Sequence, residues 1–459
     1  MSKGKVYLVG AGPGDAELIT RKGYQLISQA DVILHDHLIP TELLRVARAD
    51  AEVISVGKYA GRHTMPQSEI NALLVEKARG NGTVVRLKGG DPYLFGRGGE
   101  EAEACVEAAI DFEVVPGITS ALAAPCYGGV PPTHRGYASS VALATGHRRD
   151  EKKVEPPRAD TLVFLMSVAN IEEIIKTLRE SGWPSETRIA AVENGTRYDQ
   201  RVVEGTLESF VEVAQRARLR TPAVFVVGQV VALKEKLDWF GKRPKILLPG
   251  MHPEKYGHLG TVVHRPLIRC VSLEDHTKAD AILSRLSPYD WLVFTSTNGV
   301  SFFFERLHAI GLDARALGSV KVAAIGKTTA EQLKGYGVLA DMLPELESSV
   351  GLLREFRKID VEGRKILLVR PKAGASGLSD GLAEAGATVD AVVVYRNIEV
   401  EPDEVDFDYI DQILFTSGST VRAFLSRYGS VPAGVKVYCL GQPTLDEASK
   451  HGIKAELLP

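Results

Sequence analysis

Short runs of apolar, largely β-branched residues recur along the first half of this 459-residue chain, and their spacing constrains its fold more than any other feature. Examples are residues 5–10 (KVYLVG), 83–87 (TVVRL), 161–166 (TLVFLM) and 223–228 (AVFVVG). Segments with helical periodicity, such as residues 68–82 (SEINALLVEKARGNG), separate them. This alternation of strand and helix patterns is typical of α/β proteins. We therefore predict an α/β fold.

The length of the chain predicts more than one domain, because a single hydrophobic core stops growing well below this size. Near residues 241–244 a helix-like segment passes through a short basic stretch with Gly and Pro into a new strand-like run at residues 245–248. Such punctuation is typical of a domain boundary. We predict one domain over residues 1–240 and a second over residues 245–459.

The second half contains an imperfect internal repeat. Residues 291–307 followed by 321–338 are echoed by residues 412–428 followed by 436–453. Each copy has the pattern of a strand, a polar loop, a helix, a second strand, a loop with Gly or Thr, and a second helix. The repeat predicts two similar α/β lobes whose loops face a cleft.

Charge and cysteine content exclude several functions. A net charge of -3, from 55 basic and 58 acidic residues, provides no general attraction for nucleic acid. The four cysteines have no metal-type spacing, so we expect free thiols in a reducing compartment and no metal site.

The sequence shows neither an export signal nor an apolar run long enough to span a membrane. We expect a cytoplasmic protein.

Three loops that follow predicted strands are candidates for ligand binding. Residues 9–15 (VGAGPGD) allow close backbone approach, although the glycine spacing differs from that of dinucleotide folds. Residues 86–99 (RLKGGDPYLFGRGG) describe a rigid turn with exposed amides and the carboxylate of Asp91, which could hold the amino acid end of a cofactor. Thr119 and Ser120 lie at a predicted helix start, where capping alone would explain them.

Taken in order, the segments VGAGPGD, HDHLI, VGKYAG, RLKGGDPYLFGRGGEE, VVPGITSA, TLVFLM and VENGT resemble the uroporphyrinogen-III C-methyltransferase family over residues 4–240. The resemblance implies a two-lobed tetrapyrrole methylase fold with S-adenosylmethionine in its cleft, and a homodimer through this half. It places cofactor contacts on Pro13, Gly89, Gly90, Asp91, Leu94, Thr119, Ser120, Met166 and Gly195.

The same resemblance implies acid/base roles for Asp36 and Lys58. From the residues alone, Asp36 is typical of a solvated loop carboxylate, Lys58 of a surface charge and Met166 of a core residue. A porphyrinogen substrate with eight carboxylates needs local cations, and five candidates lie on predicted loops: Arg62, His63, Arg97, His134 and Arg135. Each of these, taken singly, also fits a solvated surface charge.

From Lys245 onward, the segments FTSTNGV, VAAIGKTTAE, VVVYRN, FTSGSTV and GQPTLDEA resemble uroporphyrinogen-III synthase, which closes linear hydroxymethylbilane while inverting its last ring. The resemblance implies one lobe over residues 245–270 and 400–459 and another over 275–395. Its expected substrate-binding side chains are Thr295, Ser296, Asn298, Thr328, Ser417, Ser419 and Thr420. Helix capping explains such Ser, Thr and Asn residues equally well.

Tyr395 is implied to assist departure of the substrate hydroxyl, with a half-buried aromatic at a linker as the competing interpretation. Only ten residues, 251–260, separate two predicted strands, so we expect the first helix of this half to be cut short.

We therefore expect a bifunctional enzyme that makes uroporphyrinogen III and methylates it twice to precorrin-2, on the way to siroheme or cobalamin. Two alternatives stay open. The second half could only bind and deliver a tetrapyrrole, or the methylase could act on another corrin intermediate.

Overall fold

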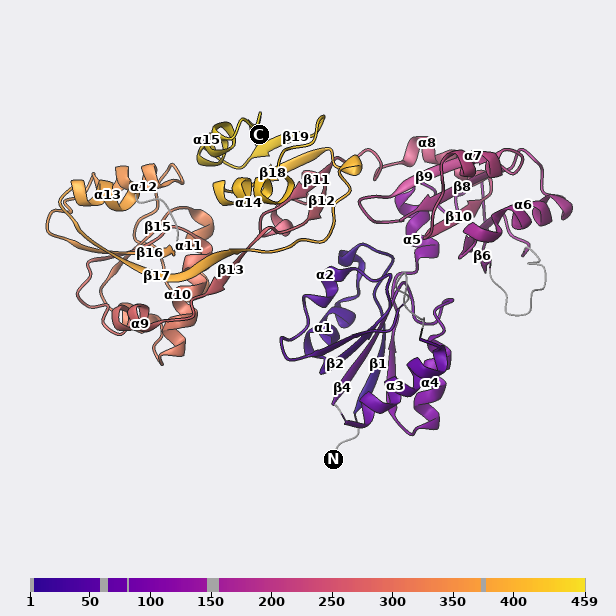
Figure 1. Cartoon of the computed structure of the whole chain (residues 1–459), viewed down its shortest axis with the longest axis horizontal. Helices are drawn as coiled ribbons and strands as arrows, with labels where there is room; N and C mark the ends of the chain where they lie inside the picture. Colours follow the sequence, from indigo (N-terminus) through magenta and orange to yellow (C-terminus); the bar gives the residue numbers. More distant parts are fainter. Residues whose placement is uncertain (1–3, 58–64, 81, 147–156, 373–376, 459) are drawn as a thin grey trace. The chain divides into compact units, whose positions relative to one another are not determined.

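Four five-stranded sheets form the framework of the described chain (Figure 1). The computed structural model describes residues 4–57, 65–80, 82–146, 157–372 and 377–458. The chain divides into two compact units, Met1–Lys245 with Leu259–Thr261 and Ile246–His258 with Val262–Pro459. Each unit contains two of the sheets with helices packed on them, so the predicted α/β class is confirmed.

The first sheet of unit one is parallel throughout and has the order β3-β2-β4-β1-β5. Because its central strands are covered on both faces, they consist almost entirely of buried residues. Its strands are β1 (Lys5–Gly10), β2 (Val32–His35), β3 (Glu52–Ser55), β4 (Thr83–Lys88) and β5 (Asp111–Val115). Its helices are α1 (Arg21–Gln29), α2 (Thr41–Leu44), α3 (Gln67–Gly80) and α4 (Gly98–Glu107). The carboxyl ends of parallel strands meet at one edge, which gathers the glycine-rich loops there.

The second sheet of unit one is mixed, with the order β6-β7-β10-β8-β9 and antiparallel pairing everywhere except between β6 and β7. Its strands are β6 (Val141–Thr145), β7 (Thr161–Leu165), β8 (Arg188–Glu193), β9 (Arg201–Thr206) and β10 (Ala223–Val227). Its helices are α5 (Ser120–Tyr127), α6 (Ile171–Glu180), α7 (Phe210–Arg216) and α8 (Lys234–Leu237). Unit one is thus two-lobed, as expected for the methylase fold.

Unit two shows the predicted repeat, since the two copies have the same order of strand, helix, strand and helix. The first copy is β14 (Trp291–Phe294), α10 (Thr297–Ala309), β15 (Lys321–Ala324) and α11 (Lys327–Gly335). The second copy is β18 (Gln412–Phe415), α14 (Gly418–Tyr428), β19 (Lys436–Cys439) and α15 (Gln442–Lys450). In both copies the two strands are parallel neighbours, so their helices begin at the same edge of a sheet.

The remaining strands complete the two sheets of unit two, in the orders β12-β11-β18-β19-β20 and β13-β17-β16-β14-β15. They are β11 (Lys245–Leu248), β12 (Thr261–His264), β13 (Ile268–Ser272), β16 (Lys365–Pro371), β17 (Thr388–Glu399) and β20 (Glu456–Leu457), and the remaining helices are α9 (Thr277–Leu283), α12 (Ser349–Phe356) and α13 (Gly377–Glu384). Only a 3-10 turn, Pro253–Lys255, lies between β11 and β12, so the prediction of a shortened first helix is confirmed.

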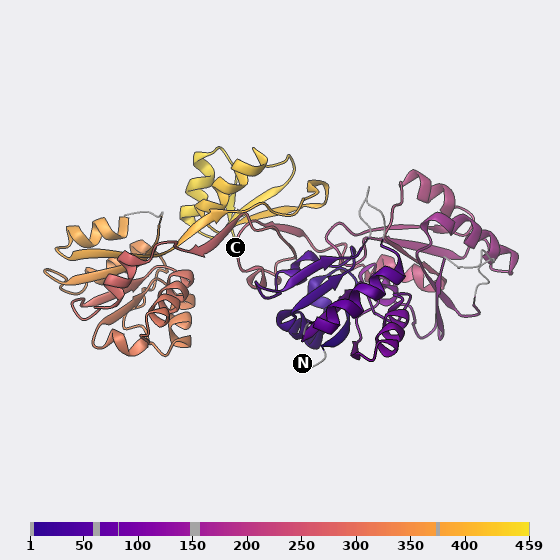
Figure 2. The same ribbon diagram turned by 60° about the horizontal axis from the view of Figure 1, so that its bottom comes forward.

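The course of β13 differs from the expected lobe limits. This strand pairs in antiparallel fashion with β17, and Figures 1 and 2 both show the two strands running side by side. Residues 268–270, expected at the end of the first lobe, therefore lie in the sheet of the second. β17 likewise continues to Glu399, beyond residue 395, the expected end of the second lobe.

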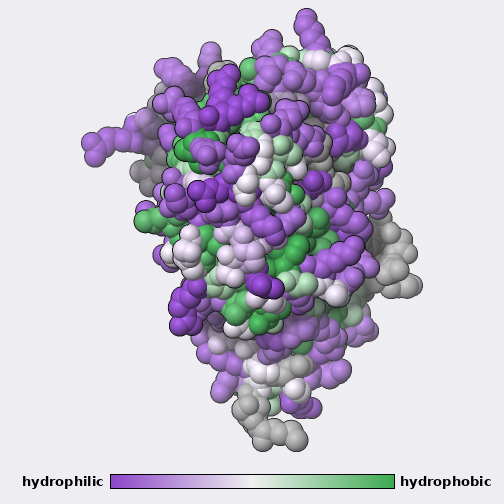
Figure 3. Space-filling model, turned by 90° about the vertical axis from the view of Figure 1, so that its left-hand side faces the viewer, coloured by the Kyte–Doolittle hydropathy of each residue, from purple (hydrophilic) through white to green (hydrophobic). Residues whose placement is uncertain are grey.

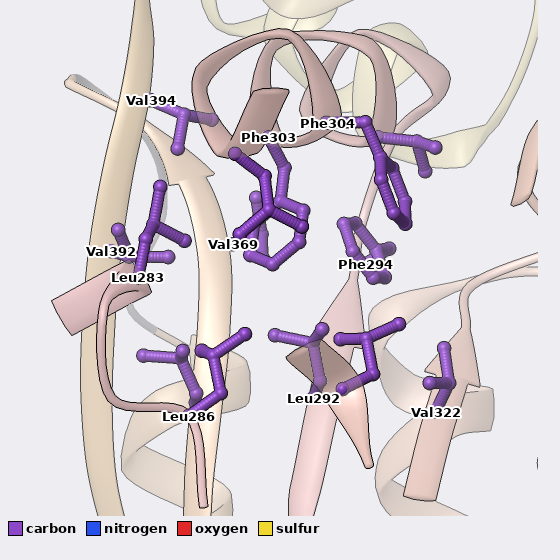
Figure 4. Close-up of a cluster of buried hydrophobic side chains, with 14 of the residues drawn as sticks. Leu283, Leu286, Leu292, Phe294, Phe303, Phe304, Val322, Val369, Val392 and Val394 are labelled. Atoms are coloured by element: carbon purple, nitrogen blue, oxygen red, sulfur yellow. The ribbon is translucent and has the colours of Figure 1, made fainter. Parts of the chain in front are cut away.

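An aromatic cluster fixes α10 against the sheet of its lobe (Figure 4). Phe294 on β14 and Phe303 on α10 contact edge to face, with ring centroids 5.2 Å apart. Phe304 packs in the same cluster, and all three side chains are fully buried. Because each ring buries a large apolar area, this contact determines where the amino-terminal end of α10 lies.

Hydrophilic residues cover most of the face shown in Figure 3, with hydrophobic residues in small groups among them. Unit two exposes some large apolar side chains, including Leu339, Leu346 and Val350. Among the described residues, no helix has the length and apolar character that crossing a membrane requires.

Candidate functional site

Three loops at the carboxyl edge of the first sheet pack backbone against backbone. A Cβ atom on Gly117 would lie 2.2 Å from the carbonyl oxygen of Gly90, and one on Gly10 would lie 2.5 Å from the Cα of Gly117. Gly90 N–H also donates to the carbonyl of Gly12 at 2.7 Å. No side chain fits between these loops, so glycine is required at 10 and 117 for packing.

Gly89 and Gly90 have room that packing does not use. A Cβ on Gly89 would find no atom closer than 3.7 Å, and one on Gly90 none closer than 3.8 Å, where the nearest atoms belong to Thr119 and Ser120 at the start of α5. Gly90 also has a φ of 67°, which favours glycine. This space beside main-chain amides suits a ligand with polar groups.

Asp91 fixes the loop that carries these two glycines. Its Oδ1 accepts hydrogen bonds from the amides of Tyr93 (2.9 Å) and Leu94 (3.2 Å), and its Oδ2 accepts one from Gly117 N–H (3.0 Å). Both carboxylate oxygens are thus engaged by the backbone. A contact between Asp91 and a cofactor would have to come in addition to these bonds.

The expected residues of α5 and its surroundings have distinct positions. Thr119 is the N-cap of α5 and its side chain accepts from Ala121 N–H at 3.2 Å, so capping accounts for it, whereas Ser120 makes no such cap. Leu94 is partly buried and packs on the apolar cluster of the second sheet. Pro13 is partly exposed in the loop after β1.

The second sheet contributes two strained loops. Met166 directly follows β7 with a φ of 53° and an exposed fraction of 49%. The interpretation of Met166 as a core residue is therefore wrong, because the turn directs this apolar side chain outward. Gly195 lies between Asn194 (φ 51°) and Thr196 (φ 73°). Left-handed backbone in residues other than glycine costs free energy and often accompanies ligand sites.

Hydrogen bonds link the loop of Gly195 to the first glycine-rich loop. Thr196 Oγ1 accepts from Asp15 N–H at 3.0 Å, and Tyr127 OH donates to Asp15 Oδ2 at 3.1 Å. Burial, followed by the Asp15 carboxylate, raises the pKa of Tyr127 well above its ordinary value. The tyrosine is therefore a neutral donor at neutral pH, and it ties α5 to the loop after β1.

Asp36 follows β2 and is anchored to β4. Its amide donates to the carbonyl of Leu87 at 3.1 Å, and its Oδ1 accepts from Arg86 Nη2 at 2.5 Å. Arg86 and Lys88 are both buried and share the fully buried Glu101. Burial, together with the Arg86 guanidinium, lowers the pKa of Lys88. Sequence reasoning missed this network, although two cations alternating in an apolar strand were its visible signal.

Three of the predicted cationic and acid/base residues, Lys58, Arg62 and His63, lie outside the described residues. Arg97 forms a bidentate ion pair with Glu100, at 2.8 and 2.7 Å, and this hydrogen bonding raises the pKa of Arg97. His134 contacts the ring of Tyr137 and is exposed, as is Arg135.

In unit two, the predicted hydroxyl residues lie at corresponding helix starts in the two copies of the repeat. Ser296 caps α10 by accepting from Gly299 N–H at 3.0 Å, and Ser417 caps α14 with a capping box. Thr420 belongs to that box and is fully buried, so it supports the loop and presents no surface to a ligand. Capping is therefore the observed role of these three side chains.

The other predicted side chains of these loops retain accessible surface. Thr295, Asn298 and Ser419 are partly exposed, and Thr328 is exposed on the first turn of α11. Ser419 Oγ lies 2.9 Å from Ser417 Oγ. Thr295 Oγ1 donates to the carbonyl of Val369 at 3.4 Å. A substrate-binding role of these side chains stays a prediction.

Tyr395 connects β17 to the start of α10. Its hydroxyl lies 3.2 Å from Ser296 Oγ, and its ring stacks on Phe302 with centroids 5.2 Å apart. The side chain is only 5% exposed, so it is more deeply buried than the half-buried linker residue suggested by the sequence. Burial raises the pKa of Tyr395, while the hydrogen bond with Ser296 opposes this shift. The tyrosine can therefore act as a hydrogen-bond donor.

Fold and sites together define a two-part α/β protein with a separate candidate ligand site in each part. Residues 5–211 match the family of tetrapyrrole (corrin/porphyrin) methylases, and residues 253–459 match uroporphyrinogen-III synthase HemD. The porphyrin biosynthesis protein HemD of Ruminiclostridium josui is 36% identical over 99% of this chain and 95% of its own length. The chain belongs to this family of fused proteins of tetrapyrrole biosynthesis, and the predicted family resemblance is confirmed.

Other similar proteins match one half. The siroheme synthase of Pseudoalteromonas atlantica is 48% identical over 52% of this chain and 53% of its own length, so the chain spans about half of that relative. A uroporphyrin-III C-methyltransferase from Thermus thermophilus, solved with S-adenyl homocysteine, is 40% identical, with a TM-score of 0.45, over 50% of this chain and all of its own. A mutant uroporphyrinogen III synthase from Thermus thermophilus is 19% identical, with a TM-score of 0.36, over 46% of this chain and 90% of its own.

Proposed function

We propose that unit one transfers two methyl groups from S-adenosylmethionine to uroporphyrinogen III, giving precorrin-2, and that unit two produces uroporphyrinogen III from hydroxymethylbilane. The observation that carries the first activity is the open space at Gly89 and Gly90, beside the amides that begin α5. This space fits the amino acid end of a cofactor, since a Cβ atom on either glycine would find no atom closer than 3.7 Å. The similarity to the porphyrin biosynthesis protein HemD, which extends over 99% of this chain, supports both activities together.

Several residues of unit one would hold the cofactor: Pro13, Gly89, Gly90, Asp91, Leu94, Thr119, Ser120, Met166 and Gly195. When bound, S-adenosylmethionine supplies an electrophilic methyl group. Methylation of a pyrrole carbon has to be followed by loss of a proton, which the Asp36 carboxylate would accept. Lys58 would supply the complementary acid. Cations such as Arg97, His134 and Arg135 would meet substrate carboxylates.

In unit two, Tyr395 and Ser296 would hydrogen-bond the departing hydroxyl of hydroxymethylbilane, because their own hydroxyls lie 3.2 Å apart at the start of α10. Thr295, Asn298, Thr328, Ser417 and Ser419 would orient the flexible substrate, with Thr420 supporting their loop. Gly441 is the N-cap of α15, and no side chain caps this helix. Pro443 has no N–H and the amides of Thr444 and Leu445 donate to the carbonyl of Gly441, so the amides of Gly441 and Gln442 would meet a substrate carboxylate. Orientation of this kind is the main contribution a protein makes to such a cyclisation.

The proposal also covers location and assembly. We propose a cytoplasmic homodimer that works without nucleic acid or membrane. Four unpaired cysteines support a reducing location. Siroheme and cobalamin are both possible ends of the pathway that precorrin-2 enters.

The test supplies the purified full chain with hydroxymethylbilane, with and without S-adenosylmethionine, and analyses products by absorbance and mass. Type III uroporphyrinogen without the cofactor, and a dimethylated product with it, are the expected results. If only the spontaneous type I isomer forms without the cofactor, unit two is not a working synthase. The alternative of a binding and delivery module, which the single 3-10 turn between β11 and β12 favours, then remains. Uroporphyrinogen III added directly then tests unit one alone.

A further inference from the structure

β4 carries two charged residues in an otherwise apolar interior. Val84, Arg86 and Lys88 are every second residue of this strand, so they lie on the same face. Val84 packs in the hydrophobic cluster formed with α3 and α4. Arg86 and Lys88 are each only 2% exposed. Burial of two cations is unfavourable unless acceptors with good geometry surround them.

One carboxylate inside the protein meets both cations. Glu101 of α4 has no exposed surface, and its Oε1 accepts from Arg86 Nε at 2.9 Å, Lys88 Nζ at 3.0 Å and Gln67 Nε2 at 3.2 Å. Its Oε2 has no partner among the described residues. A single negative charge therefore faces two positive charges, and the buried group carries a net charge of about +1.

Asp36 completes the charge balance. It lies 33% exposed at the end of β2 and receives Arg86 Nη2 on Oδ1. The remaining Arg86 donor, Nη1, is directed to the carbonyls of Leu34 and Leu87, at 3.5 and 3.2 Å. Because Nε, Nη1 and Nη2 of Arg86 all make contacts, its planar guanidinium is held in a single orientation. This orientation determines where the Asp36 carboxylate lies.

We propose that Arg86, held by Glu101, is a positioning residue for the reaction of unit one: it orients the Asp36 carboxylate so that Oδ2, which has no partner among the described residues, faces the substrate. The inference rests on the proposed acid/base role of Asp36. Lys88 contacts Glu101 but not Asp36, so it neutralises the buried carboxylate without orienting the reactive one.

The test is a double-mutant cycle in the full-length protein, with Arg86→Lys and Asp36→Asn alone and together. Arg86→Lys keeps the charge, which limits the risk of unfolding, but an ammonium cannot hold two carboxylates in the geometry of a guanidinium. Steady-state methylation of uroporphyrinogen III gives kcat and KM, and calorimetric binding of S-adenosylhomocysteine reports whether the cofactor site is intact.

Asp36→Asn is expected to lower kcat about 100-fold or more, the usual contribution of a general acid or base. Arg86→Lys is expected to lower kcat about 10- to 100-fold with little change in KM, since it disturbs the same step only through Asp36. Because Arg86 acts through Asp36, the double variant is expected to be no slower than Asp36→Asn alone. Binding of S-adenosylhomocysteine is expected to change less than about threefold in all three.

Arg201→Lys is the matched control. Arg201 also pairs with a buried carboxylate, Glu193, at 2.7 Å, and also donates to a main-chain carbonyl, that of Ala217, at 2.7 Å. Arg201 makes no contact with Asp36, so the kcat of the Arg201→Lys variant is expected to stay within about twofold of that of the wild type.

The inference would be overturned if the two substitutions together lowered kcat by the product of their separate effects. It would also be overturned if Arg86→Lys were as active as the wild type. Full activity of Asp36→Asn would also overturn it while leaving the methylation function intact. If Arg86→Lys loses S-adenosylhomocysteine binding along with kcat, its role is structural and the inference fails. A wild-type protein that does not methylate uroporphyrinogen III refutes the proposed function itself.

Discussion

Replacing Asp91 by alanine tests how the cofactor loop of unit one is held. The change removes the acceptor of three main-chain amides, those of Tyr93, Leu94 and Gly117. A hydrogen bond to a charged group contributes about 1.5–3 kcal/mol, and because Asp91 is only partly buried, water recovers part of this. We expect the free energy of unfolding of unit one to fall by about 2–3 kcal/mol in total.

The same loss reaches the ligand site, because the loop carries Gly89 and Gly90. Ligand binding then has to restore the loop conformation, and a cost of about 2–3 kcal/mol corresponds to an affinity loss of up to about 100-fold. Isothermal titration calorimetry with S-adenosylhomocysteine measures the affinity, and urea denaturation measures the stability. The affinity for S-adenosylhomocysteine and the free energy of unfolding are both expected to fall.

Asp160→Ala provides the control. The Asp160 carboxylate accepts from the amides of Ser139 and Ser140, at 2.8 and 3.0 Å, at the start of a strand in the second sheet. This variant is expected to lose stability and keep its affinity for S-adenosylhomocysteine. An Asp91→Ala variant with unchanged stability and abolished binding would refute the loop argument and make Asp91 a direct ligand contact.

Three further predictions concern stability and accessibility. Hydrogen bonds from two lysines lower the pKa of Glu113 to about 2 from an ordinary 4.5, so its stabilising effect is complete above pH 4.5 and is lost as the pH falls towards 2. Acid unfolding of Glu113→Gln, followed by circular dichroism, should therefore depend less on pH in that window. Iodoacetamide at pH 7 should modify the exposed Cys126 first and spare Cys105, whose pKa burial raises to about 11, as peptide mass mapping would show. Phe294→Ala should destabilise unit two by about 3–5 kcal/mol in urea and leave unit one unchanged.

Opposite results would contradict each of these. If acid unfolding of Glu113→Gln depends on pH as strongly as that of the wild type, the two lysines do not lower the pKa of Glu113 in the folded protein. Glu100→Gln is the surface control. Equal labelling of Cys105 and Cys126 would contradict the burial of Cys105. A loss below about 1 kcal/mol for Phe294→Ala would mean that the aromatic cluster is loosely packed.

Local patterns predicted the elements, while long-range contacts determined the chemistry around them. The run at residues 83–87 predicted β4, because its apolar, β-branched composition is visible in neighbouring positions. The pairing of Arg86 with Asp36 and Glu101 depends on strand order and on where α4 packs, and neither is visible in a window of sequence. The burial of Thr420 was missed for the same reason.

Met166 shows a different limit of sequence reasoning. Its apolar neighbours on β7 suggested a core position, but a left-handed turn immediately after the strand exposes the side chain. The family resemblance identified Met166 as a ligand residue without that information, and its exposure is compatible with this prediction. The role of Lys58 stays a prediction, since the structure does not describe it.

The packing of Gly10, Gly90 and Gly117 restricts how this protein can evolve or be redesigned. A side chain on Gly10 or Gly117 would collide with main-chain atoms of the other loops, so no change of a neighbouring side chain can make room for it. Single substitutions and compensating pairs are both blocked there. Gly89 has free space, so it tolerates a methyl group that would reshape the pocket. A change in ligand preference is therefore accessible through Gly89, while the backbone around Gly10 and Gly117 stays fixed.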